Sequence, residues 1–369
     1  MIIGIPKEVF LGERRVSLVP NSVGQLVKSG LDVIVQSKAG NESMISDDEY
    51  VNVGASISKD AKSLYSSAET ILKVQKPLDV EVELFQEEAT LICFIQPLAD
   101  STLLQQLAKN KVSVFSMDTI PRIAKAQSMD ALSSMASISG YKAALMAAES
   151  MSKYLPMMIT AAGTTPPSKG LVIGAGVAGL QSIATAKRLG AVMYAFDVRP
   201  AVEEQVKSLG ANFISTSIST EDAEGSGGYA KEINDEEQNK DREILQNHIK
   251  DMDFVISTAA VPGKRAPLLI TSDMVNSMRP GSVIIDLAAE TGGNCELTHP
   301  GETYNHNEVI VSGPLNVPSS MPLHASQLYS RNIYNLLMHI MKEDSLEVDS
   351  EDEIILSSRI AYKGTVLRK

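Results

Sequence analysis

The sequence contains little cysteine. Cys93 and Cys295 are the only two in 369 residues, and they lie far apart. Neither belongs to a C-x-x-C pair or another spacing typical of metal sites. So low a count is typical of a reducing compartment and excludes a disulfide-based scaffold. We therefore expect two buried, small apolar side chains and no metal site.

A long uninterrupted apolar run is also missing. The most apolar stretch, 171–186, is broken by a glycine-rich turn and by Gln181 and Ser182, so it is too short to cross a bilayer. The first eight residues lack the basic and apolar segments of a signal peptide. We expect a cytoplasmic protein that does not insert into the membrane.

Positive charge is in deficit as well. Thirty-three Lys and Arg stand against 45 Asp and Glu, a formal net charge of −12. Without a basic stripe the chain has nothing to neutralise a phosphate backbone, so a nucleic-acid partner is excluded. The hydrophobic fraction of 44% and the charged fraction of 21% are those of a globular protein. The length favours two domains.

Short β-rich runs alternate with helical stretches along the chain. In the N-terminal third, strands are predicted at 2–5, 33–36, 70–74, 91–95 and 112–115, with helices at 21–29, 59–67 and 101–109. After a long Ala-, Met- and Ser-rich helix at 129–154, strands are predicted at 171–173, 192–196, 213–214, 254–257, 282–287 and 309–311. Such alternation is typical of parallel sheets with helices on both faces.

We therefore predict an α/β fold with two Rossmann-like, doubly wound parallel-sheet domains and a nucleotide cleft between them. A last helix, predicted at 324–341, is expected to pack back on the first domain. The N-terminal domain would then comprise 1–135 and about 315–369, and the second domain 136–314. Two interpretations of 354–369 remain open at this point, an ordered segment or a linker.

A glycine-rich motif, Gly174-Ala175-Gly176-Val177-Ala178-Gly179, directly follows the predicted strand 171–173 and precedes a predicted helix at 180–189. In this context the first glycine permits a tight turn and the second lets a pyrophosphate approach the backbone. The third allows close helix–strand packing. The helix N-terminus then offers free N–H groups to the diphosphate. The motif predicts a dinucleotide-binding site.

Asp197 ends the next predicted strand, about 20 residues downstream. Its carboxylate is expected to accept hydrogen bonds from the adenosine ribose and to repel a 2′-phosphate, which favours NAD(H). Arg199 leaves some binding of NADP(H) open. The alternative is a tight turn followed by an unrelated surface aspartate. We also count Val198, Arg199, Thr258 and Ala259 among the expected cofactor contacts.

Several segments resemble the NAD-binding subunits of proton-translocating NAD(P) transhydrogenases, within the alanine dehydrogenase/transhydrogenase family. The resemblance runs from Ile2 to about Met341. It is carried by the stretches 156–160, 172–181, 184–191, 283–288 and 316–319 and by Gly292-Gly293-Asn294.

The most specific segment is 121–134, in which the resemblance assigns Arg122, Gln127, Asp130 and Ser133 to contacts with the nicotinamide. Asp130 and Ser133 share one helical face, and both can bond a carboxamide. Gln127 offers a donor and an acceptor without a titrating proton, which suits positioning of a ring. The alternative is that these residues only cap the long helix, with Ser128 as N-cap.

A second matching segment is Gly227-Gly228-Tyr229-Ala230-Lys231-Glu232. The resemblance implies a mobile loop over about 221–237 that closes over bound nucleotide, with Tyr229 contacting it. The glycines would supply the hinge that such a lid needs. A plain flexible loop is the alternative.

The resemblance implies direct hydride transfer between NAD(H) on this chain and NADP(H) on a partner subunit. It also implies coupling to proton translocation by membrane-embedded partner subunits. The chain would be a homodimer, peripheral on the inner face of the cytoplasmic membrane.

Two other functions must be weighed. Alanine dehydrogenases resemble this chain at Glu13-Arg14-Arg15-Val16, but Gln75 and Gln96 stand where those enzymes carry a lysine and a histidine. Glu290 replaces their catalytic-site aspartate. Neither glutamine exchanges a proton near neutral pH, so the acid–base groups of amino-acid oxidation are missing. A non-catalytic NADH-binding module would not need the nicotinamide set at 122–133.

Overall fold

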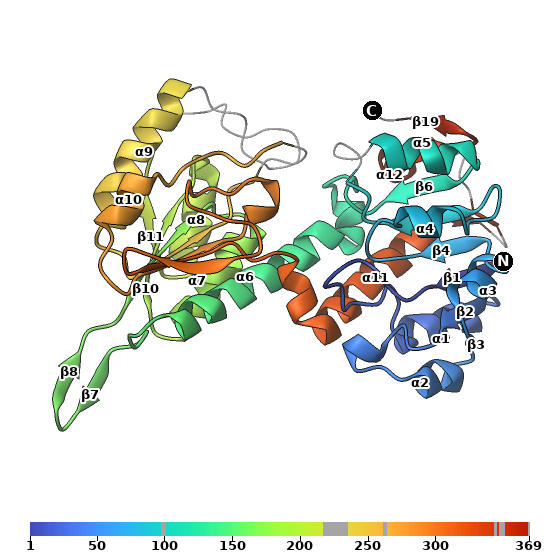
Figure 1. Ribbon diagram of the computed structural model, residues 1–369, viewed down its shortest axis with the longest axis horizontal. Helices are drawn as coiled ribbons and strands as arrows, with labels where there is room; N and C mark the ends of the chain where they lie inside the picture. Colours follow the sequence, from blue (N-terminus) through green and yellow to red (C-terminus); the bar gives the residue numbers. More distant parts are fainter. Residues whose placement is uncertain (97–100, 217–234, 261–263, 343–344, 347–350, 368–369) are drawn as a thin grey trace. The chain divides into compact units, whose positions relative to one another are not determined.

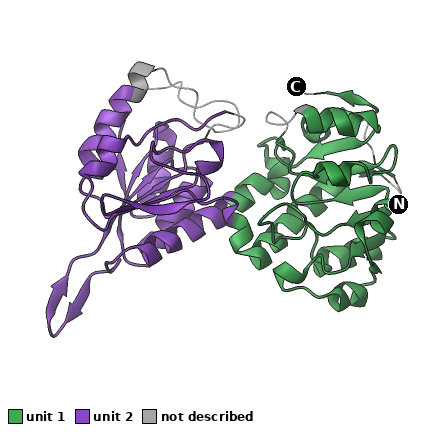
Figure 2. Ribbon diagram, in the orientation of Figure 1, with its two compact units in different colours: residues 1–135, 318–369 green, residues 136–317 purple. Residues whose placement is uncertain are grey.

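The computed structural model describes residues 1–96, 101–216, 235–260, 264–342, 345–346 and 351–367. The chain divides into two compact units (Figure 2). Unit 1 comprises 1–135 and 318–369, and unit 2 comprises 136–317. The division falls inside the long helix α6 (Ala131–Ser150).

Unit 1 contains an eight-stranded sheet in the order β19-β18-β6-β5-β4-β1-β2-β3 (Figure 1). The six strands from the N-terminal third of the chain are parallel, whereas β18 and β19 are antiparallel. The strands are β1 (Ile2–Ile5), β2 (Asp32–Gln36), β3 (Ser56–Ser58), β4 (Thr70–Leu72), β5 (Thr90–Cys93), β6 (Ser113–Ser116), β18 (Arg359–Tyr362) and β19 (Thr365–Val366). A separate pair is formed by β16 (Met341–Lys342) and β17 (Ser345–Leu346).

The helices of unit 1 come from both of its chain segments. They are α1 (Pro20–Lys28), α2 (Asp47–Asn52), α3 (Ala61–Tyr65), α4 (Asp79–Val82), α5 (Ser101–Lys109), α11 (Pro322–Ile340) and α12 (Glu353–Ser358), with 3₁₀ turns η1 (Asn41–Ser43) and η2 (Ala124–Met129). Helix α11 joins the N-terminal segment through hydroxyls. The N–H of Val16 donates to Ser326 Oγ at 3.0 Å, and Tyr329 Oη donates to the Lys73 carbonyl at 2.8 Å. Residues 353–367 are ordered, since β18 pairs with β6.

Unit 2 contains a seven-stranded sheet in the order β11-β10-β9-β12-β13-β15-β14. Its strands are β9 (Lys169–Ile173), β10 (Val192–Phe196), β11 (Asn212–Ile214), β12 (Phe254–Ser257), β13 (Val283–Asp286), β14 (Thr303–His306) and β15 (Val309–Ser312). Its helices besides α6 are α7 (Val177–Arg188), α8 (Glu203–Ser208), α9 (Asp235–Ile249) and α10 (Ser272–Ser277), with 3₁₀ turns η3 (Pro200–Val202) and η4 (Ala289–Thr291). The 3₁₀ turn η5 (Val317–Ser320) begins at the last residue of unit 2 and continues in unit 1.

The central strands β9, β12 and β13 of unit 2 are apolar on both faces, as parallel strands covered by two helical layers must be. Val172, Ala195 and Ile256 pack with residues of α6, α7 and α8 on one face. Leu171 and Val255 pack with residues of α9 and α10 on the other. In both sheets the chain runs outward from a central strand, returns, and continues on the other side. The predicted doubly wound α/β class is confirmed.

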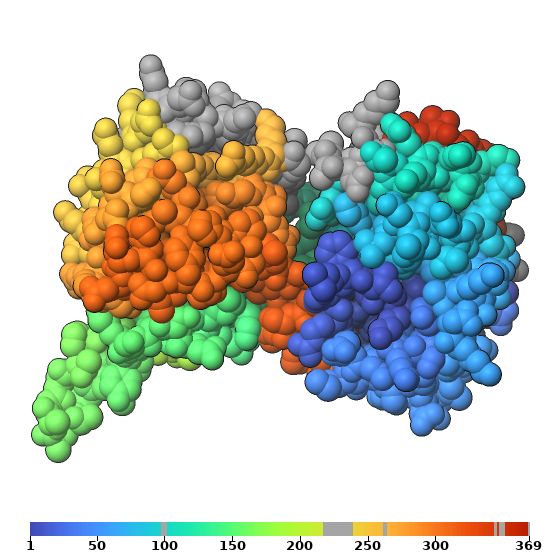
Figure 3. All heavy atoms as spheres, viewed as in Figure 1, coloured from blue at the N-terminus to red at the C-terminus, as the bar shows by residue number. Residues whose placement is uncertain are grey.

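A β-hairpin extends from the body of unit 2 (Figures 1 and 3). It is formed by β7 (Met158–Thr160) and β8 (Gly163–Thr165), which pair antiparallel. The side chains of Met157 and Ile159 are 57% and 74% exposed. The sequence analysis did not predict this hairpin, because its strands are three residues long and do not alternate apolar with polar residues.

Both cysteines are buried, as expected, at 0% and 2% exposure. Burial raises the pKa of Cys93 well above its usual range and that of Cys295 to about 11. Across the described residues, none of the helices is both long enough and apolar enough to cross a bilayer.

Candidate dinucleotide and nicotinamide sites

The glycine-rich turn of unit 2 has the geometry that a dinucleotide needs. Gly174 has a φ of 91°, in the left-handed region that favours glycine. A Cβ on Gly179 would lie 1.9 Å from the Gly174 carbonyl oxygen, so α7 can begin this close to β9 only with glycine there. A Cβ on Gly176 would meet nothing within 4 Å, which leaves the backbone open to an approaching diphosphate.

Helix α7 starts at Val177, three residues earlier than predicted, and Gly176 is its N-cap. Ala178 and Gly179 thus lie in its first turn. The N–H groups of a first helical turn have no partner within the helix, and the helix dipole is positive there. Ala175 is buried and packs in the apolar core of unit 2. The turn can therefore hold an anion through the backbone alone.

The turn lies where the strand order reverses. Strand β9 is flanked by β10 on one side and β12 on the other, and ligands of such sheets bind at the carboxyl ends of these strands. Thr258 follows β12, and its hydroxyl donates to the Gly174 carbonyl at 2.8 Å. The N–H of Ala259 donates to Asn294 Oδ1 at 3.1 Å. Thr258 and Ala259 therefore border the turn.

Asp197 is placed directly after β10 and is 5% exposed. Its Oδ2 accepts the N–H of Ala175 at 2.7 Å, which holds the glycine-rich turn. The Arg199 guanidinium donates to both carboxylate oxygens, at 2.9 and 2.8 Å, and the Arg199 N–H donates to Oδ1. The expected ribose contact therefore has to share the carboxylate with Arg199. Val198 lies between the two and is partly buried.

Two residues at this edge were not assigned a role from the sequence. Asp286, at the end of β13, is fully buried and accepts hydrogen bonds from the hydroxyls of Ser257 at 2.9 Å and Thr298 at 2.6 Å. Its Oδ2 also accepts the N–H of Asn294, whose amide holds Ala259 by both backbone groups. Asp286 and Asn294 thus order the loops after β12 and β13. The sequence signal that could have identified Asp286 is an aspartate at the end of an apolar strand.

Gly140 lets α6 and α7 come into contact. A Cβ there would lie 2.1 Å from the carbonyl oxygen of Ala178, in the first turn of α7. Ser182 Oγ donates to both the Gly140 and the Ala178 carbonyls at 2.9 Å. The single glycine of α6 therefore sets how closely that helix approaches the start of α7.

The candidate nicotinamide set lies in unit 1, from Arg122 just before η2 to Ser133 in the first turn of α6. Arg122 and Gln127 are exposed. Asp130 accepts the Ser133 N–H on Oδ1 at 2.8 Å and the Ser133 hydroxyl on Oδ2 at 2.5 Å. The structure therefore brings Asp130 and Ser133 together, and Gln127 lies one turn before them on η2.

The capping alternative is wrong for Ser128, although another residue of the set, Asp130, does cap the long helix. Helix α6 begins at Ala131, and the side chain that accepts first-turn N–H donation is Asp130. The carbonyl of Ser128 instead accepts hydrogen bonds from α11, at 2.9 Å from Asn332 and 3.1 Å from Asn335. The sequence analysis began the helix at 129, two residues before α6 starts, and Ser128 lies inside the 3₁₀ turn η2 rather than at the cap position.

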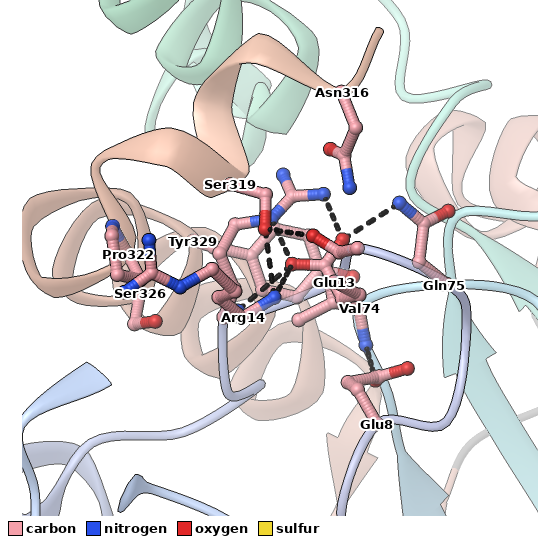
Figure 4. A network of polar contacts seen from close by, with 12 residues as sticks. Glu8, Glu13, Arg14, Val74, Gln75, Asn316, Ser319, Pro322, Ser326 and Tyr329 are labelled. Atoms are coloured by element: carbon pink, nitrogen blue, oxygen red, sulfur yellow. Dashed lines mark hydrogen bonds and ion pairs between the residues drawn. The ribbon is translucent and has the colours of Figure 1, made fainter. Parts of the chain in front are cut away.

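The segment resembling the substrate site of alanine dehydrogenases forms a closed polar network (Figure 4). Arg15 is buried and donates to both carboxylate oxygens of Glu13, at 2.7 and 2.6 Å. Gln75 Nε2 donates to Glu13 Oε2 at 2.8 Å. Burial would raise the pKa of Glu13, but the hydrogen bonds and charge of Arg15 lower it to about 2. Glu13 is thus charged at neutral pH.

Lys73, two residues before Gln75, does not replace the missing lysine. It is fully buried, and its Nζ lies 2.7 Å from Glu81 Oε1 and 3.3 Å from Glu8 Oε2. Burial would lower the pKa of Lys73, but these two carboxylates raise it. An ammonium held this way is not a base near neutral pH.

At the other two positions of the alanine comparison, Gln96 has no titrating proton, and Glu290 is a carboxylate engaged by backbone. Gln96 is exposed with a φ of 52°, and its N–H donates to Asp118 at 2.9 Å. Glu290 accepts the backbone N–H of Asn316 at 2.6 Å. Tyr229 and the glycines before it lie outside the described residues, as does most of the expected loop over 221–237.

Two family models match almost the whole chain. The N-terminal domain of alanine dehydrogenase/PNT matches residues 4–139, and its C-terminal domain matches residues 143–369. The chain is 44% identical to an NAD(P) transhydrogenase alpha subunit of Rhodospirillum rubrum, covering 100% of this chain and 98% of the relative. It is also 44% identical to NAD(P) transhydrogenase subunit alpha of Haemophilus influenzae, covering 99% of this chain and 71% of that relative.

A solved transhydrogenase from Sinorhizobium meliloti has the same fold, with a TM-score of 0.88, 38% identity and coverage of 100% and 99% of the two chains. Alanine dehydrogenase of Staphylococcus saprophyticus is 33% identical and covers 87% of this chain and 82% of the relative. On these matches and on the geometry of its glycine-rich turn, the chain belongs to the alanine dehydrogenase/PNT family.

Proposed function

We propose that this chain is the NAD(H)-binding subunit of an NAD(P) transhydrogenase. It would present NADH for direct hydride transfer to NADP held on a partner subunit. One observation carries this proposal. The glycine-rich turn is complete, whereas Gln75 and Gln96 stand at the positions that amino-acid oxidation needs for proton exchange. Hydride exchange between two nicotinamides needs no proton acceptor.

Unit 2 would bind the dinucleotide. The residues from Gly174 to Gly179 would hold the diphosphate, and Asp197 the adenosine ribose. Val198, Arg199, Thr258 and Ala259 would line the same edge, with Tyr229 in a loop that covers the nucleotide. The exposed backbone at Gly176 and the contact between Thr258 and Gly174 support this assignment.

Unit 1 would supply the contacts to the nicotinamide. The paired Asp130 and Ser133 would bond its carboxamide, Arg122 would lie near it, and Gln127 would orient the ring. The exposure of Gln127 supports a role toward a ligand rather than in the core. The two reacting carbons must approach within roughly 3–3.5 Å, so small errors in ring position are expensive.

The test is a hydride-transfer assay on the chain mixed with its NADP-binding partner subunit, using NADH and a nicotinamide analogue. Wild-type protein should transfer hydride, and Gln127→Asn should lower the rate on the order of tenfold. NADH affinity should stay within a few-fold, because the diphosphate and ribose contacts are unchanged. No transfer by the wild type would overturn the proposed function, and a normal rate in Gln127→Asn would overturn the role of that residue.

The remaining elements of the proposal concern assembly. The chain would be a homodimer, bound through membrane-embedded and NADP-binding subunits to the inner face of the cytoplasmic membrane. Those partners would couple hydride transfer to proton translocation. The exposed apolar side chains of the β7–β8 hairpin support self-association, since a monomer gains nothing from exposing them. Light scattering on the purified chain would measure the oligomeric state.

A further inference from the structure

The 3₁₀ turn η2 carries an exposed residue of proposed function, Gln127. On each side of Gln127, side chains from other elements contact the turn, and we call these contacts anchors. Gln127 is exposed, whereas Ala126 and Met129 are buried at 0% and 6%. A 3₁₀ turn has poorer hydrogen-bond geometry than an α-helix, so its conformation depends more on outside contacts. The contacts that fix η2 therefore fix Gln127.

The first anchor comes from α11. Asn332 and Asn335 lie three apart on that helix and so share one face. Both side-chain amides donate to the carbonyl of Ser128, at 2.9 and 3.1 Å. One carbonyl with two lone pairs is thus bonded twice from the same helix. This carbonyl belongs to the residue directly after Gln127.

The second anchor comes from the start of α12. Lys125, two residues before Gln127, places its Nζ 3.1 Å from Asp352 Oδ2. The other oxygen of Asp352 accepts the N–H of Ile354 at 2.9 Å and lies 2.9 Å from His339 Nε2. Asp352 therefore joins η2, α11 and α12. The charge-assisted bonds that it accepts hold the pKa of Asp352 well below its usual range, with the His339 contact as the largest cause.

We propose that Asn335, Asn332 and Asp352 are positioning residues that fix Gln127 for hydride transfer. The segment at 351–358 would then belong to the catalytic apparatus, although it lies more than 200 residues away in the sequence. The inference rests on the proposed function. These side chains would act through η2, since their described contacts are with Ser128 and Lys125.

The test uses Asn335→Asp and Asp352→Asn, singly and together, in the full-length chain mixed with the NADP-binding subunit. Aspartate at 335 replaces a donor by an acceptor facing the Ser128 carbonyl, and asparagine at 352 removes the charge facing Lys125. Asparagine still caps a helix. Both sites are partly exposed, so the variants should fold. The double variant should lower the hydride-transfer rate on the order of tenfold. NADH affinity should change less than twofold.

Two matched controls separate position from charge. Glu87→Gln breaks an exposed ion pair of unit 1, in which Lys111 Nζ lies 2.8 Å from Glu87. Asn52→Asp adds the same charge as Asn335→Asp on an exposed helix end. Neither residue contacts η2 in any described hydrogen bond or ion pair. Both controls should keep the wild-type rate.

A cycle with Gln127→Asn distinguishes positioning from general weakening. If the anchors act through Gln127, adding Asn335→Asp and Asp352→Asn to Gln127→Asn should reduce the rate no further. Multiplied losses, a rate that falls only with NADH affinity, or a double variant with the wild-type rate would each overturn the inference. Absence of hydride transfer in the wild type would overturn the proposed function instead.

Discussion

Asp197 and Arg199 form a pair in which each side chain limits the other. The carboxylate is almost fully buried, and the guanidinium bonds both of its oxygens. Without Arg199 as its partner, the Asp197 carboxylate would repel a 2′-phosphate. Without Asp197, the Arg199 guanidinium would attract one. The proposed preference for NADH would therefore depend on the carboxylate of Asp197 keeping its contacts with the Arg199 guanidinium.

We predict that Asp197→Ala weakens NADH binding by about 1–3 kcal/mol, the range for a lost charged hydrogen bond. Because Arg199 is released, NADPH should bind the variant more tightly than it binds the wild type. Calorimetric titration with both nucleotides measures the two effects. Equal affinity of the wild type for NADH and NADPH would contradict the assignment of Asp197.

Because of Glu13, we expect the free energy of unfolding to depend on pH in the acid range. Its pKa is about 2 in the folded chain and 4.5 in a free side chain. A carboxyl group whose pKa is lower in the folded than in the unfolded chain stabilises the native state at pH values above the unfolded pKa. For Glu13 this contribution is lost as the pH falls from about 4.5 towards 2. Near pH 7 the full contribution is present.

We predict that Glu13→Gln lowers the free energy of unfolding by about 3–5 kcal/mol at pH 7, because the buried Arg15 loses its ion pair with Glu13. The variant should also lose less stability than the wild type between pH 4.5 and 3. Urea unfolding across this range measures both. The control is Glu42→Gln, which breaks the exposed ion pair with Arg14 and should cost less than about 1 kcal/mol. Equal losses in the two variants would contradict the role of Glu13.

Among the elements, α6 and α7 depend on each other through a single glycine. Gly140 faces the Ala178 carbonyl, and Ser182 bonds both residues. A methyl group at 140 must push the first turn of α7 away. That turn is the proposed diphosphate site, so packing and binding should change together.

We predict that Gly140→Ala lowers the free energy of unfolding by about 1–3 kcal/mol, the usual range for overpacking. NADH binding should weaken as well, because the first-turn N–H groups move. Fluorescence titration and urea unfolding measure the two effects. Ser139→Ala, at the neighbouring position of α6, is the control and should change neither. Unchanged NADH affinity in Gly140→Ala would show that α7 accommodates the methyl group elsewhere.

At the scale of the whole molecule, the same fold occurs in two kinds of protein of this family, transhydrogenase subunits and alanine dehydrogenases. The chain is 44% identical to transhydrogenase alpha subunits and 33% identical to an alanine dehydrogenase. The difference lies in titratable groups rather than in architecture. Gln75 bonds Glu13, and Lys73 is neutralised by two carboxylates. Neither side chain can exchange a proton with an amino acid near neutral pH.

We therefore predict that the purified chain does not reduce NAD with alanine. Absorbance at the NADH maximum, over a range of alanine concentrations, measures this directly. Glutamine has no titrating proton in the accessible pH range, so raising the pH should not restore activity. Appreciable NADH formation from alanine would contradict the transhydrogenase assignment and favour the dehydrogenase.

The sequence by itself determined the α/β class and the dinucleotide turn. Parallel strands covered on both faces must be apolar along their whole length, so β9, β10 and β12 are visible as short apolar runs. The turn is visible because Gly174 adopts a positive φ and Gly179 allows close helix–strand packing, while Gly176 leaves the backbone open. The missing acid–base groups also follow from residue type alone.

Only the tertiary structure decided which distant residues support these sites. The need for glycine at 140 becomes clear from the nearby Ala178 carbonyl, and the role of Asp286 from the loop residues that it bonds. Strand β18 is recognised by its pairing with β6, and the role of Asn335 by its hydrogen bond to the carbonyl of Ser128. The Gly140, β18 and Asn335 contacts join segments far apart in the chain. A hydrogen bond or a close approach leaves no periodic pattern in the sequence on either side.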